Sequence, residues 1–417
     1  MELLLQSSIV NLHSSIDISG SKSETNRLLL LQALYPDIVL ENTSNSDDSE
    51  VMIKALFATD NVVDIHHAGT TMRFLTAYFA IQKGREVTLT GSNRMKERPI
   101  KILVDALRQL GAKIEYTENE GFPPLKITGK KLTLNKVTLD ANVSSQYISA
   151  LLLIAAKLEN GLELTLEGEI TSVPYIKMTL ALLNELGINT SFEGNKIVVE
   201  SQFKIQHSKF IIESDWSSAS YFYSIIALSE IGTQISLSSY KKTSLQGDSV
   251  LVEIYKDFGV ETVFENNTIN IRKAGNCQLP IVKYQLNNAP DIAQTIAVTC
   301  FGLGIGCHLT GLHTLKIKET DRLEALKTEL TKLGATISVN NDSLILAPHS
   351  LKFDEMAFSL KGEVATYNDH RMAMAFAPLA LKRPIVIEEA EVVSKSYPDF
   401  WKDLRKIGFQ ISEIGKI

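Results

Sequence analysis

The feature that most constrains this chain is an internal repeat, in which one pattern recurs every 72 to 76 residues. In each copy an amphipathic segment ends in a hydrophobic residue, a glycine follows, and a short alternating stretch typical of a strand comes next. The glycine suits the left-handed position just after the last turn of a helix. The five copies carry it at Gly111, Gly187, Gly259, Gly334 and Gly408. Residues 47–60 are interpreted as a degenerate first copy without the glycine.

A second kind of segment alternates with the first along the chain. Each begins with Ser, Thr or Asp and then becomes almost wholly apolar, which predicts a helix surrounded by protein. The six expected starts lie near Ser23, Thr70, Ser144, Ser217, Asp291 and Asp369. Each repeat is therefore predicted to be an α/β module with one buried helix.

The length of the chain and the number of modules predict two domains. A chain of 417 residues with 44% hydrophobic content can bury more than one core. Six modules give three to each domain. We expect the first domain to span 21–213 and the second to combine 1–20 with 214–417, with a hinge near residues 20 and 213.

Composition excludes several classes of protein. The formal net charge is only -6, so no bulk field would hold nucleic acid, and a bound anion must meet a local cluster of cations. The three cysteines lack a paired spacing, which argues against a disulfide framework or a thiol zinc site. No apolar run is long enough to span a bilayer, and no export signal is visible. We expect a soluble cytoplasmic protein with no membrane partner.

The starts of the apolar helices are the first candidates for ligand binding. Unpaired backbone N–H groups there favour phosphate or carboxylate. Polar residues at a helix start are also ordinary N-caps. Capping is the expected role of four residues taken singly, namely Ser23, Thr70, Ser144 and Ser217.

Arginines in these apolar helices strengthen the case. Arg27, Arg73 and Arg371 fall in first turns that have no solvated face. A buried guanidinium needs an anionic partner, which can be an internal carboxylate or a bound ligand. For one arginine both alternatives stay open, but three together favour an anion site. Further cations stand in loop-like segments, namely Lys22, Arg94, Arg98, Lys318, Arg322 and Lys395.

Acid and base candidates gather in the second half of the chain. The cluster Lys318, Glu319, Asp321 and Arg322 can serve proton transfer beside an anion clamp, or it can be a charged first helical turn. Composition alone favours the helical turn. Asp291 opens an apolar helix, either as an N-cap or as a base facing a substrate hydroxyl, and capping is its expected role when it is taken alone.

Seven motifs, in order, carry a resemblance that covers nearly the whole chain. They are GSKSETNR at 20–27, AGTTMR at 68–73, RMKERP at 94–99, SSQ at 144–146, KETDR at 318–322, NDHRMAM at 368–374 and SKSYPDF at 394–400. This set resembles that of the 5-enolpyruvylshikimate-3-phosphate synthases. The resemblance implies a two-domain, inside-out α/β barrel. Each domain then has three repeated α/β units with buried helices, and the active site lies in the interdomain cleft.

The resemblance also implies a reaction. It is transfer of the enolpyruvyl group of phosphoenolpyruvate to the 5-hydroxyl of shikimate 3-phosphate by addition and elimination, with release of phosphate. This is a step of the shikimate pathway to chorismate and the aromatic amino acids. The resemblance further implies a monomer that uses no metal and no organic cofactor, has only small-molecule partners, and is inhibited by the herbicide glyphosate at the phosphoenolpyruvate site.

Individual roles follow from the matching motifs. The catalytic positions implied are Asp291 as base, and Glu319, Lys318 and Lys22 as groups that handle protons. The shikimate 3-phosphate positions implied are Lys22, Ser23, Arg27, Ser144, Ser145, Gln146, Ser172, Tyr175, Asp291 and Lys318. The phosphoenolpyruvate positions implied are Lys22, Gly69, Arg98, Gln146, Arg322, Arg371 and Lys395. Three residues depart from the commonest pattern of the family, namely His67, Phe74 and Thr314.

Two alternatives compete with this interpretation. A transferase that acts on UDP-N-acetylglucosamine shares the fold and the donor, but it would have asparagine at position 23 and a reactive cysteine near 90–100, where this chain has Ser23 and no cysteine. A non-catalytic anion-binding protein would keep the cations and lose the acid and base positions. Asp291, Lys318 and Glu319 are all present, which argues against it.

Overall fold

The structure is a computed structural model and describes residues 1–7, 13–141, 144–349 and 362–415. The chain divides into two compact units. Unit 1 combines Met1–Ser19 with Glu213–Ile417, and unit 2 is Gly20–Ile212. The predicted division near residues 20 and 213 falls one residue away from these limits, and the hinge itself stays a prediction.

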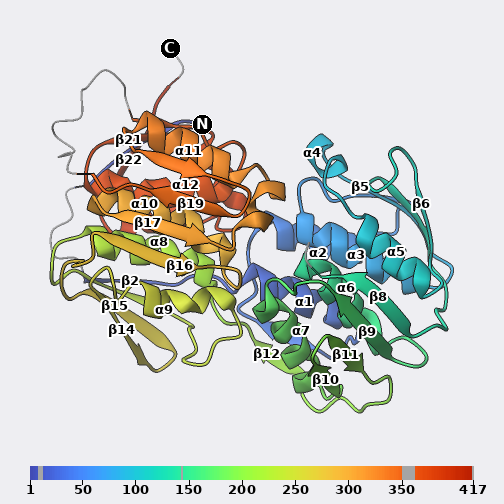
Figure 1. Cartoon of the computed structure of the whole chain (residues 1–417). Helices are drawn as coiled ribbons and strands as arrows, with labels where there is room; N and C mark the ends of the chain where they lie inside the picture. Colours follow the sequence, from blue (N-terminus) through green and yellow to red (C-terminus); the bar gives the residue numbers. More distant parts are fainter. Residues whose placement is uncertain (8–12, 142–143, 350–361, 416–417) are drawn as a thin grey trace. The chain divides into compact units, whose positions relative to one another are not determined.

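Unit 2 has three buried helices that contact one another, α1 (Lys22–Leu34), α3 (Gly69–Ile81) and α6 (Ser145–Ala155). In α3, nearly every residue from Gly69 to Ala80 is buried, so the helix has no solvated face. The remaining helices of this unit are α2 (Asp47–Leu56), α4 (Asn93–Lys96), α5 (Lys101–Gln109) and α7 (Val173–Leu186). Figure 1 shows α1, α3 and α6 inside the unit and its sheets outside.

In the part of unit 2 that the structure describes, two sheets have four strands and one has two. The first four-stranded sheet has the order β4 (Val62–Asp64), β5 (Glu86–Thr90), β7 (Leu125–Thr128), β6 (Lys113–Tyr116). The second has the order β10 (Thr190–Glu193), β11 (Lys196–Val199), β9 (Leu162–Glu167), β8 (Lys136–Asp140). The strands β3 (Val39–Glu41) and β12 (Lys209–Ile211) form a parallel pair.

Unit 1 repeats this plan around α8 (Trp216–Leu228), α10 (Ala293–Leu303) and α12 (His370–Phe376), which contact one another. Its other α-helices are α9 (Leu251–Ile254), α11 (Arg322–Lys332) and α13 (Phe400–Lys406). Among its described residues there are also five 3₁₀ turns, η1 (Gly247–Val250), η2 (Pro290–Ile292), η3 (His313–Ile317), η4 (Ala377–Leu381) and η5 (Ala390–Lys395).

The sheets of unit 1 each have four strands. The first is β14 (Val260–Glu265), β15 (Thr268–Lys273), β13 (Gln234–Ser238), β2 (His13–Ile16). The second is β16 (Ile281–Gln285), β17 (Gly306–Thr310), β19 (Ser343–Leu346), β18 (Ile337–Val339). The third is β20 (Glu363–Val364), β21 (Ile385–Ile387), β1 (Leu3–Gln6), β22 (Gln410–Glu413), so both ends of the chain complete one module.

Every four-stranded sheet has the same topology of one parallel and two antiparallel pairs. Parallel neighbours need a crossover, and in four of the five sheets a single buried helix supplies it, as α3 does between β4 and β5. The amphipathic helix then leads into the antiparallel hairpin, as α5 leads into β6 and β7. The predicted α/β class, with repeated modules and buried helices, is confirmed.

The five repeat glycines end their helical segments with positive φ, from 75° at Gly259 to 102° at Gly187. This confirms the left-handed position expected from the sequence. At Gly259 a Cβ would also lie 2.0 Å from the carbonyl oxygen of Gly275, so no other residue fits there without a shift of the backbone.

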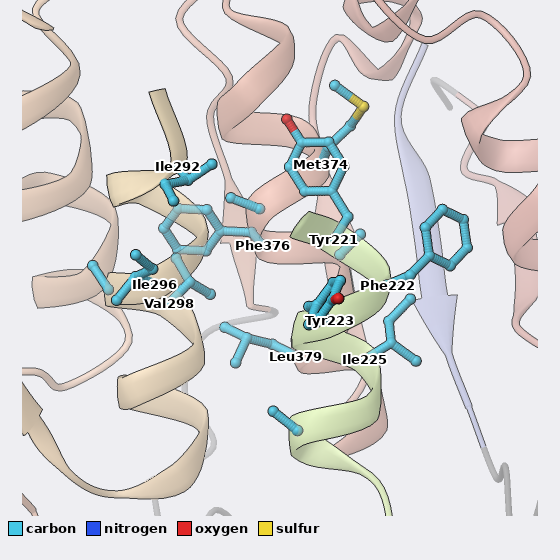
Figure 2. Close-up of a cluster of buried hydrophobic side chains, with 14 of the residues drawn as sticks. Tyr221, Phe222, Tyr223, Ile225, Ile292, Ile296, Val298, Met374, Phe376 and Leu379 are labelled. Atoms are coloured by element: carbon cyan, nitrogen blue, oxygen red, sulfur yellow. The ribbon is translucent and has the colours of Figure 1, made fainter. Parts of the chain in front are cut away.

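The core of unit 1 is aromatic at its centre (Figure 2). Tyr221 and Tyr223 of α8 are almost fully buried, as are Ile296 of α10 and Phe376 of α12. Burial of one such side chain contributes about 1.5–3 kcal/mol to folding. The hydroxyl of Tyr223 shares a hydrogen bond of 2.8 Å with Thr262. This packing holds the three central helices in place relative to one another, and it thereby positions the residues at their N-termini.

No helix in the described parts of the chain is long and apolar enough to cross a membrane.

Candidate functional site

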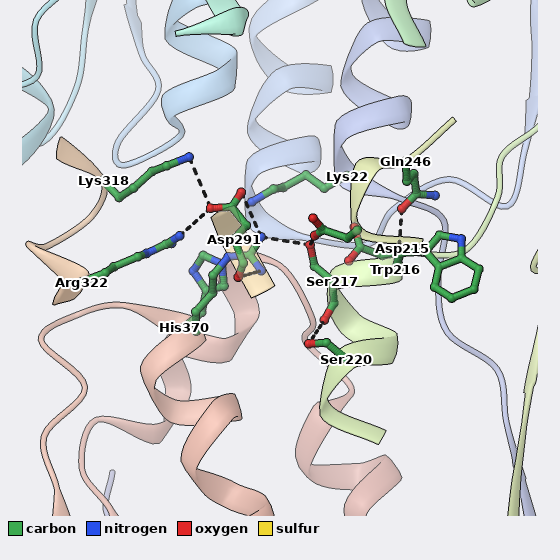
Figure 3. Close-up of polar contacts among 12 residues, drawn as sticks. Lys22, Asp215, Trp216, Ser217, Ser220, Gln246, Asp291, Lys318, Arg322 and His370 are labelled. Atoms are coloured by element: carbon green, nitrogen blue, oxygen red, sulfur yellow. Dashed lines mark hydrogen bonds and ion pairs between the residues drawn. The ribbon is translucent and has the colours of Figure 1, made fainter. Parts of the chain in front are cut away.

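A cluster of ion pairs surrounds Asp291 in unit 1 (Figure 3). Asp291 lies in η2, immediately before α10, and its side chain is 18% exposed. Its Oδ1 accepts a hydrogen bond of 2.8 Å from Arg322 Nη1 and lies 3.4 Å from Lys318 Nζ. Its Oδ2 lies 3.5 Å from Arg371 Nη2. Asp291 is thus not the N-cap that its sequence position alone suggested, because three cations hold its carboxylate.

Arg322 is the buried centre of this cluster, with a side chain only 2% exposed. Its Nη2 donates to Glu319 at 2.8 Å, and its Nε donates to Asp369 at 2.7 Å. Asp369 is fully buried and also caps α12 by accepting from the Arg371 backbone N–H. Asp321 caps α11 through the N–H groups of the next turn. The KETDR segment is therefore both a charged helix start and a part of the Asp291 cluster.

The cluster shifts the pKa values of its members. Burial alone would raise the pKa of Asp291, but Lys318, Arg371 and Arg322 together hold it well below its usual range. Burial lowers the pKa of Lys318, and the neighbouring Asp291 opposes that shift only in part. Burial also acts to lower the pKa of Arg322, but Asp369, Glu319 and Asp291 raise it. The carboxylate of Asp291 is therefore ionised, and Lys318 is the cation of the cluster that loses a proton most readily.

Lys395 lies close in the fold to the segment that leads into α12. Its Nζ donates to the backbone oxygen of Asn368 at 2.6 Å and to its Oδ1 at 2.9 Å. Asn368 and its neighbour Tyr367 both have positive φ, 58° and 54°, so this loop is strained. Lys395 thus meets neutral acceptors here, whereas the cations around Asp291 meet carboxylates.

Unit 2 brings two buried arginines to the N-terminus of α3. Arg73 and Arg98 are 5% and 8% exposed. A Cβ on Gly69 would lie 2.5 Å from Arg98 Nη1 and 3.1 Å from Arg73 Nη1, so a larger residue there would displace the two guanidiniums. Arg73 Nη1 donates to the Gly69 oxygen at 2.8 Å, and its buried Nε has no hydrogen-bond partner in the described structure. Two cations beside a helix N-terminus form a site that favours an anion.

Arg27 is the third buried arginine of unit 2. Its guanidinium donates to neutral oxygens, among them Thr179 Oγ1 at 2.7 Å and Ser149 Oγ at 2.9 Å. The rings of Phe74 and Tyr175 lie 5.5 and 5.9 Å from its Cζ, so the departure at Phe74 adds an aromatic face to the cation. No described carboxylate forms an ion pair with Arg27, and burial lowers its pKa to about 10.

Other predicted residues of unit 2 lie at helix starts. Lys22 opens α1, with its Nζ 3.9 Å from Asp48 Oδ2. Gln146 in the first turn of α6 donates to Thr70 Oγ1 at 3.2 Å, and Ser145 beside it is buried. Ser172, before α7, has a left-handed backbone with φ 53°. Such strain in a residue other than glycine is frequent at functional sites.

The capping predictions have mixed outcomes. Ser144 caps α6 by accepting from the Gln146 N–H, as expected. Capping was the wrong role for Ser23, Thr70 and Ser217, because their helices begin one or two residues earlier than the sequence pattern suggested. The residue that caps α8 is Asp215, which accepts from the Ser218 N–H at 2.7 Å.

Several residues of these clusters were not among the site residues predicted from sequence. Asp369 was recognised only as a helix start, yet it is the buried partner of Arg322. Arg73 was recognised as a buried cation, but it was left out of the predicted site. Asp48 stands in the acidic stretch of the degenerate repeat, and no sequence signal joined it to Lys22. A polar residue in an apolar helix was the one signal that could have marked Asp369 and Arg73.

Comparison with known proteins assigns the family. The family described as "EPSP synthase (3-phosphoshikimate 1-carboxyvinyltransferase)" matches residues 55–404. A 3-phosphoshikimate 1-carboxyvinyltransferase of Bacteroides fragilis (strain YCH46) is 48% identical over 400 residues, covering 95% of this chain and 96% of that protein. The protein with the same name from Haemophilus influenzae (strain Rd) is 36% identical over 440 residues, covering 98% and 99%.

A solved structure agrees in fold. The EPSP synthase of Acinetobacter baumannii superimposes with a TM-score of 0.79 at 22% sequence identity, covering 99% of this chain and 100% of that one. The alternation of buried helices and outer sheets is thus common to both proteins. Taken with the relatives in sequence, these matches show that the chain belongs to the EPSP synthase family, the 3-phosphoshikimate 1-carboxyvinyltransferases.

Proposed function

We propose that this protein transfers the enolpyruvyl group of phosphoenolpyruvate to the 5-hydroxyl of shikimate 3-phosphate, and releases phosphate. The products are 5-enolpyruvylshikimate 3-phosphate and inorganic phosphate, on the pathway to chorismate and the aromatic amino acids. One observation carries the proposal in a chain of this family. It is the ionised carboxylate of Asp291, held at 2.8 to 3.5 Å by Arg322, Lys318 and Arg371.

Asp291 is our candidate for the base that accepts the proton of the 5-hydroxyl. Its pKa is low while three cations surround it, so it is a weak base in that state. An anionic substrate that shares these cations would draw them from Asp291 and raise its pKa. The base would then become effective when the donor is bound, which links proton transfer to substrate binding.

The acid of the reaction must deliver a proton to the methylene carbon of phosphoenolpyruvate. Glu319, Lys318 and Lys22 are our candidates. Lys318 has a lowered pKa, mainly because it is buried, and it lies 3.4 Å from Asp291. As the methylene carbon takes the proton, the hydroxyl oxygen adds to the neighbouring carbon that bears the phosphate, and a tetrahedral adduct forms. Loss of phosphate and of a methyl proton then restores the enol ether.

The cations divide between the two anionic substrates. We assign phosphoenolpyruvate to a set of cations and their neighbours, namely Lys22, Gly69, Arg98, Gln146, Arg322, Arg371 and Lys395. We assign shikimate 3-phosphate to a second set, namely Lys22, Ser23, Arg27, Ser144, Ser145, Gln146, Ser172, Tyr175, Asp291 and Lys318. Arg27 supports the second assignment, because it is a buried cation with neutral partners and a bound phosphate would supply the missing charge.

We also propose that the protein works as a cytoplasmic monomer. The three cysteines are free thiols, which suits a reducing compartment. Size-exclusion chromatography with light scattering tests the oligomeric state.

The deciding experiment measures phosphate release from phosphoenolpyruvate with two acceptors, shikimate 3-phosphate and UDP-N-acetylglucosamine. We expect release only with shikimate 3-phosphate. Release only with the nucleotide sugar would assign the chain to the other transferase. Binding of phosphoenolpyruvate without any release would favour a non-catalytic protein.

A further inference from the structure

A buried carboxylate behind Arg371 has no role in the reaction described above. Asp248 lies in η1 and is 1% exposed. Its Oδ2 accepts a hydrogen bond from Ser217 Oγ in the first turn of α8. Ser217 Oγ in turn accepts from Arg371 Nη2 at 3.1 Å. All three residues belong to unit 1, and Figure 3 shows Ser217 on the same side of α8 as Asp291.

The direction of these hydrogen bonds is fixed by chemistry. A guanidinium has donors only, and a hydroxyl has one proton to give. Ser217 must therefore accept from Arg371 and donate to Asp248. Arg371 Nη1 also donates to the backbone oxygen of Asp291 at 3.1 Å. The guanidinium is thus held from two sides, and Asp248 sets the side that Ser217 supplies.

The second oxygen of Asp248 is the unusual feature. Oδ1 is buried and has no hydrogen-bond partner in the described structure. An ionised carboxylate with one unpaired buried oxygen is costly, whereas a proton on that oxygen removes the charge. Burial is the main reason that the pKa of Asp248 rises to about 6, and Asp291 and Asp215 add to the rise while Arg371 and Ser217 oppose it. The carboxylate can therefore change its charge near neutral pH.

We propose that Asp248 is a positioning residue that orients Arg371 through Ser217, and that it takes up a proton at Oδ1 when an anion binds to Arg371. The inference rests on the proposed function, which assigns Arg371 to phosphoenolpyruvate. The proton comes from solvent, and no bond other than O–H is formed.

Electrostatics gives the direction of this coupling. The charged groups that act on Asp248 are Arg371 of α12, Asp291 of η2 and Asp215 at the start of α8. Tyr221, which acts on Arg371, has its pKa raised mainly by burial and is neutral near pH 7. A bound anion adds negative charge and offsets the field of Arg371, so ionised Asp248 becomes less stable. Protonation then leaves the full charge of Arg371 to the ligand, and affinity rises as pH falls.

The kinetic test compares wild type with Asp248→Asn from pH 5.5 to 8.5. Asparagine keeps the acceptor for Ser217 and resembles the protonated acid. We expect the KM for phosphoenolpyruvate to be equal in both proteins at the lowest pH, and about fivefold lower in the variant at the highest pH. The titration of phosphoenolpyruvate itself is common to both. A KM raised equally at every pH would indicate a merely structural role and would overturn the proposal.

Two further variants keep the test decisive. Ser217→Ala removes the hydroxyl that orients Arg371, and we expect a KM about tenfold higher across the whole range with a smaller change in kcat. A normal KM in this variant would refute the relay. Glu253→Gln changes an exposed carboxylate of α9 and should alter neither KM nor its pH dependence.

A binding measurement separates this inference from the proposed function. Sulfate stays a dianion over this pH range, and calorimetry in two buffers of different ionisation enthalpy counts the protons that accompany its binding. Wild type should take up protons as sulfate binds near pH 7, and Asp248→Asn should not. Uptake that persists in the variant, or no uptake in wild type, refutes the coupling. If wild type releases no phosphate from phosphoenolpyruvate but still takes up protons when sulfate binds, only the proposed function is refuted.

Discussion

The buried arginines of the two units meet different partners. In unit 1, Arg322 reaches Asp291, Glu319 and Asp369 within 2.8 Å, so a buried cation meets carboxylates of the same unit. In unit 2, Arg27 and Arg73 donate to hydroxyl and carbonyl oxygens, and no described carboxylate forms an ion pair with either of them. The first arrangement is compensated by the protein itself. The second leaves charge that a ligand can compensate.

This difference predicts which variants change the stability of the fold and which change ligand binding. Removing one member of a compensated cluster leaves buried charges without partners, which is costly to the fold. Removing an uncompensated buried cation relieves a desolvation cost and takes away a ligand contact. Variants of unit 1 should therefore reduce stability as well as activity, whereas arginine variants of unit 2 should mainly weaken binding.

Asp291→Ala gives the largest expected effect. Loss of the proposed base should lower kcat by about 10²–10⁴-fold, while binding of shikimate 3-phosphate stays largely intact. Steady-state phosphate release measures kcat, and calorimetry measures binding. Asp321→Asn is the matched control, because it alters a neighbouring carboxylate that caps α11 and lies 3.8 Å from Lys316, and it should leave kcat unchanged. Near-normal turnover of Asp291→Ala would remove this residue from the mechanism.

Arg322→Met tests the compensated cluster. Three carboxylates would lose their shared cation, and we expect the free energy of unfolding to fall by about 3–5 kcal/mol. Urea unfolding followed by circular dichroism measures it. Lys327→Met on the same helix removes an exposed cation paired with Glu324 at 3.1 Å, and it should cost less than about 1 kcal/mol. Equal stability of the two variants would mean that the cluster is not a stabilising unit.

Arg27→Met tests the uncompensated cation of unit 2. Stability should stay the same or rise, because a buried charge without an ion pair is replaced by an apolar chain. The KM for shikimate 3-phosphate should rise by about 10- to 100-fold, the loss expected for hydrogen bonds to a charged group. A large loss of stability with an unchanged KM would show that Arg27 serves the fold and not the ligand.

Acid should weaken unit 1 through Asp291. Its pKa is lower in the folded than in the unfolded chain, so the unfolded chain binds more protons below about pH 4, and stability is lost as pH falls through that range. Asp248 has the opposite effect, because its pKa in the folded chain is raised to about 6. Between pH 6 and 4 the folded chain binds more protons at this residue, so stability rises as pH falls. Both tryptophans, Trp216 and Trp401, lie in unit 1, so urea midpoints from their fluorescence report on this unit.

We expect the free energy of unfolding obtained from these midpoints to rise as pH falls from 6 to 4, because folded Asp248 takes up a proton. Below pH 4 the contribution of Asp291 should be lost, by about 1 kcal/mol at pH 3. An unchanged midpoint at pH 3 would contradict the compensation inferred for Asp291.

The repeat made much of the fold predictable. Each glycine after an amphipathic helix adopts a positive φ, and each apolar segment forms a buried helix, because both features depend on residues close together in sequence. Helix starts were less predictable. α1 begins at Lys22 and α3 at Gly69, each one residue before the Ser or Thr that the sequence pattern indicated as the start. The pattern cannot separate these positions, because a first helical turn accepts Lys or Gly as well as Ser or Thr.

The resemblance to the family predicted the cations and the base of the candidate site. It did not predict which carboxylates of the protein pair with the buried arginines. Arg322 and Asp369 are separated by 47 residues, and no local pattern tells which carboxylate a buried arginine will meet. The same holds for Asp248, whose link to Arg371 passes through a serine of a third segment. Such pairings depend on how repeats pack, and a single sequence does not encode them in any short window.

Ser172→Gly should have the smallest effect, and it separates a change in folding stability from a change in substrate binding. Ser172 has φ 53°, and glycine adopts this conformation without steric cost, so the variant should gain up to about 1 kcal/mol of stability. If its hydroxyl binds shikimate 3-phosphate as proposed, the KM for that substrate should rise severalfold in the more stable protein. Asn266→Gly, at a φ of 48° in the turn between β14 and β15, is the control for strain alone. A stabilised Ser172→Gly with an unchanged KM would place the strain in the fold and remove Ser172 from the binding site.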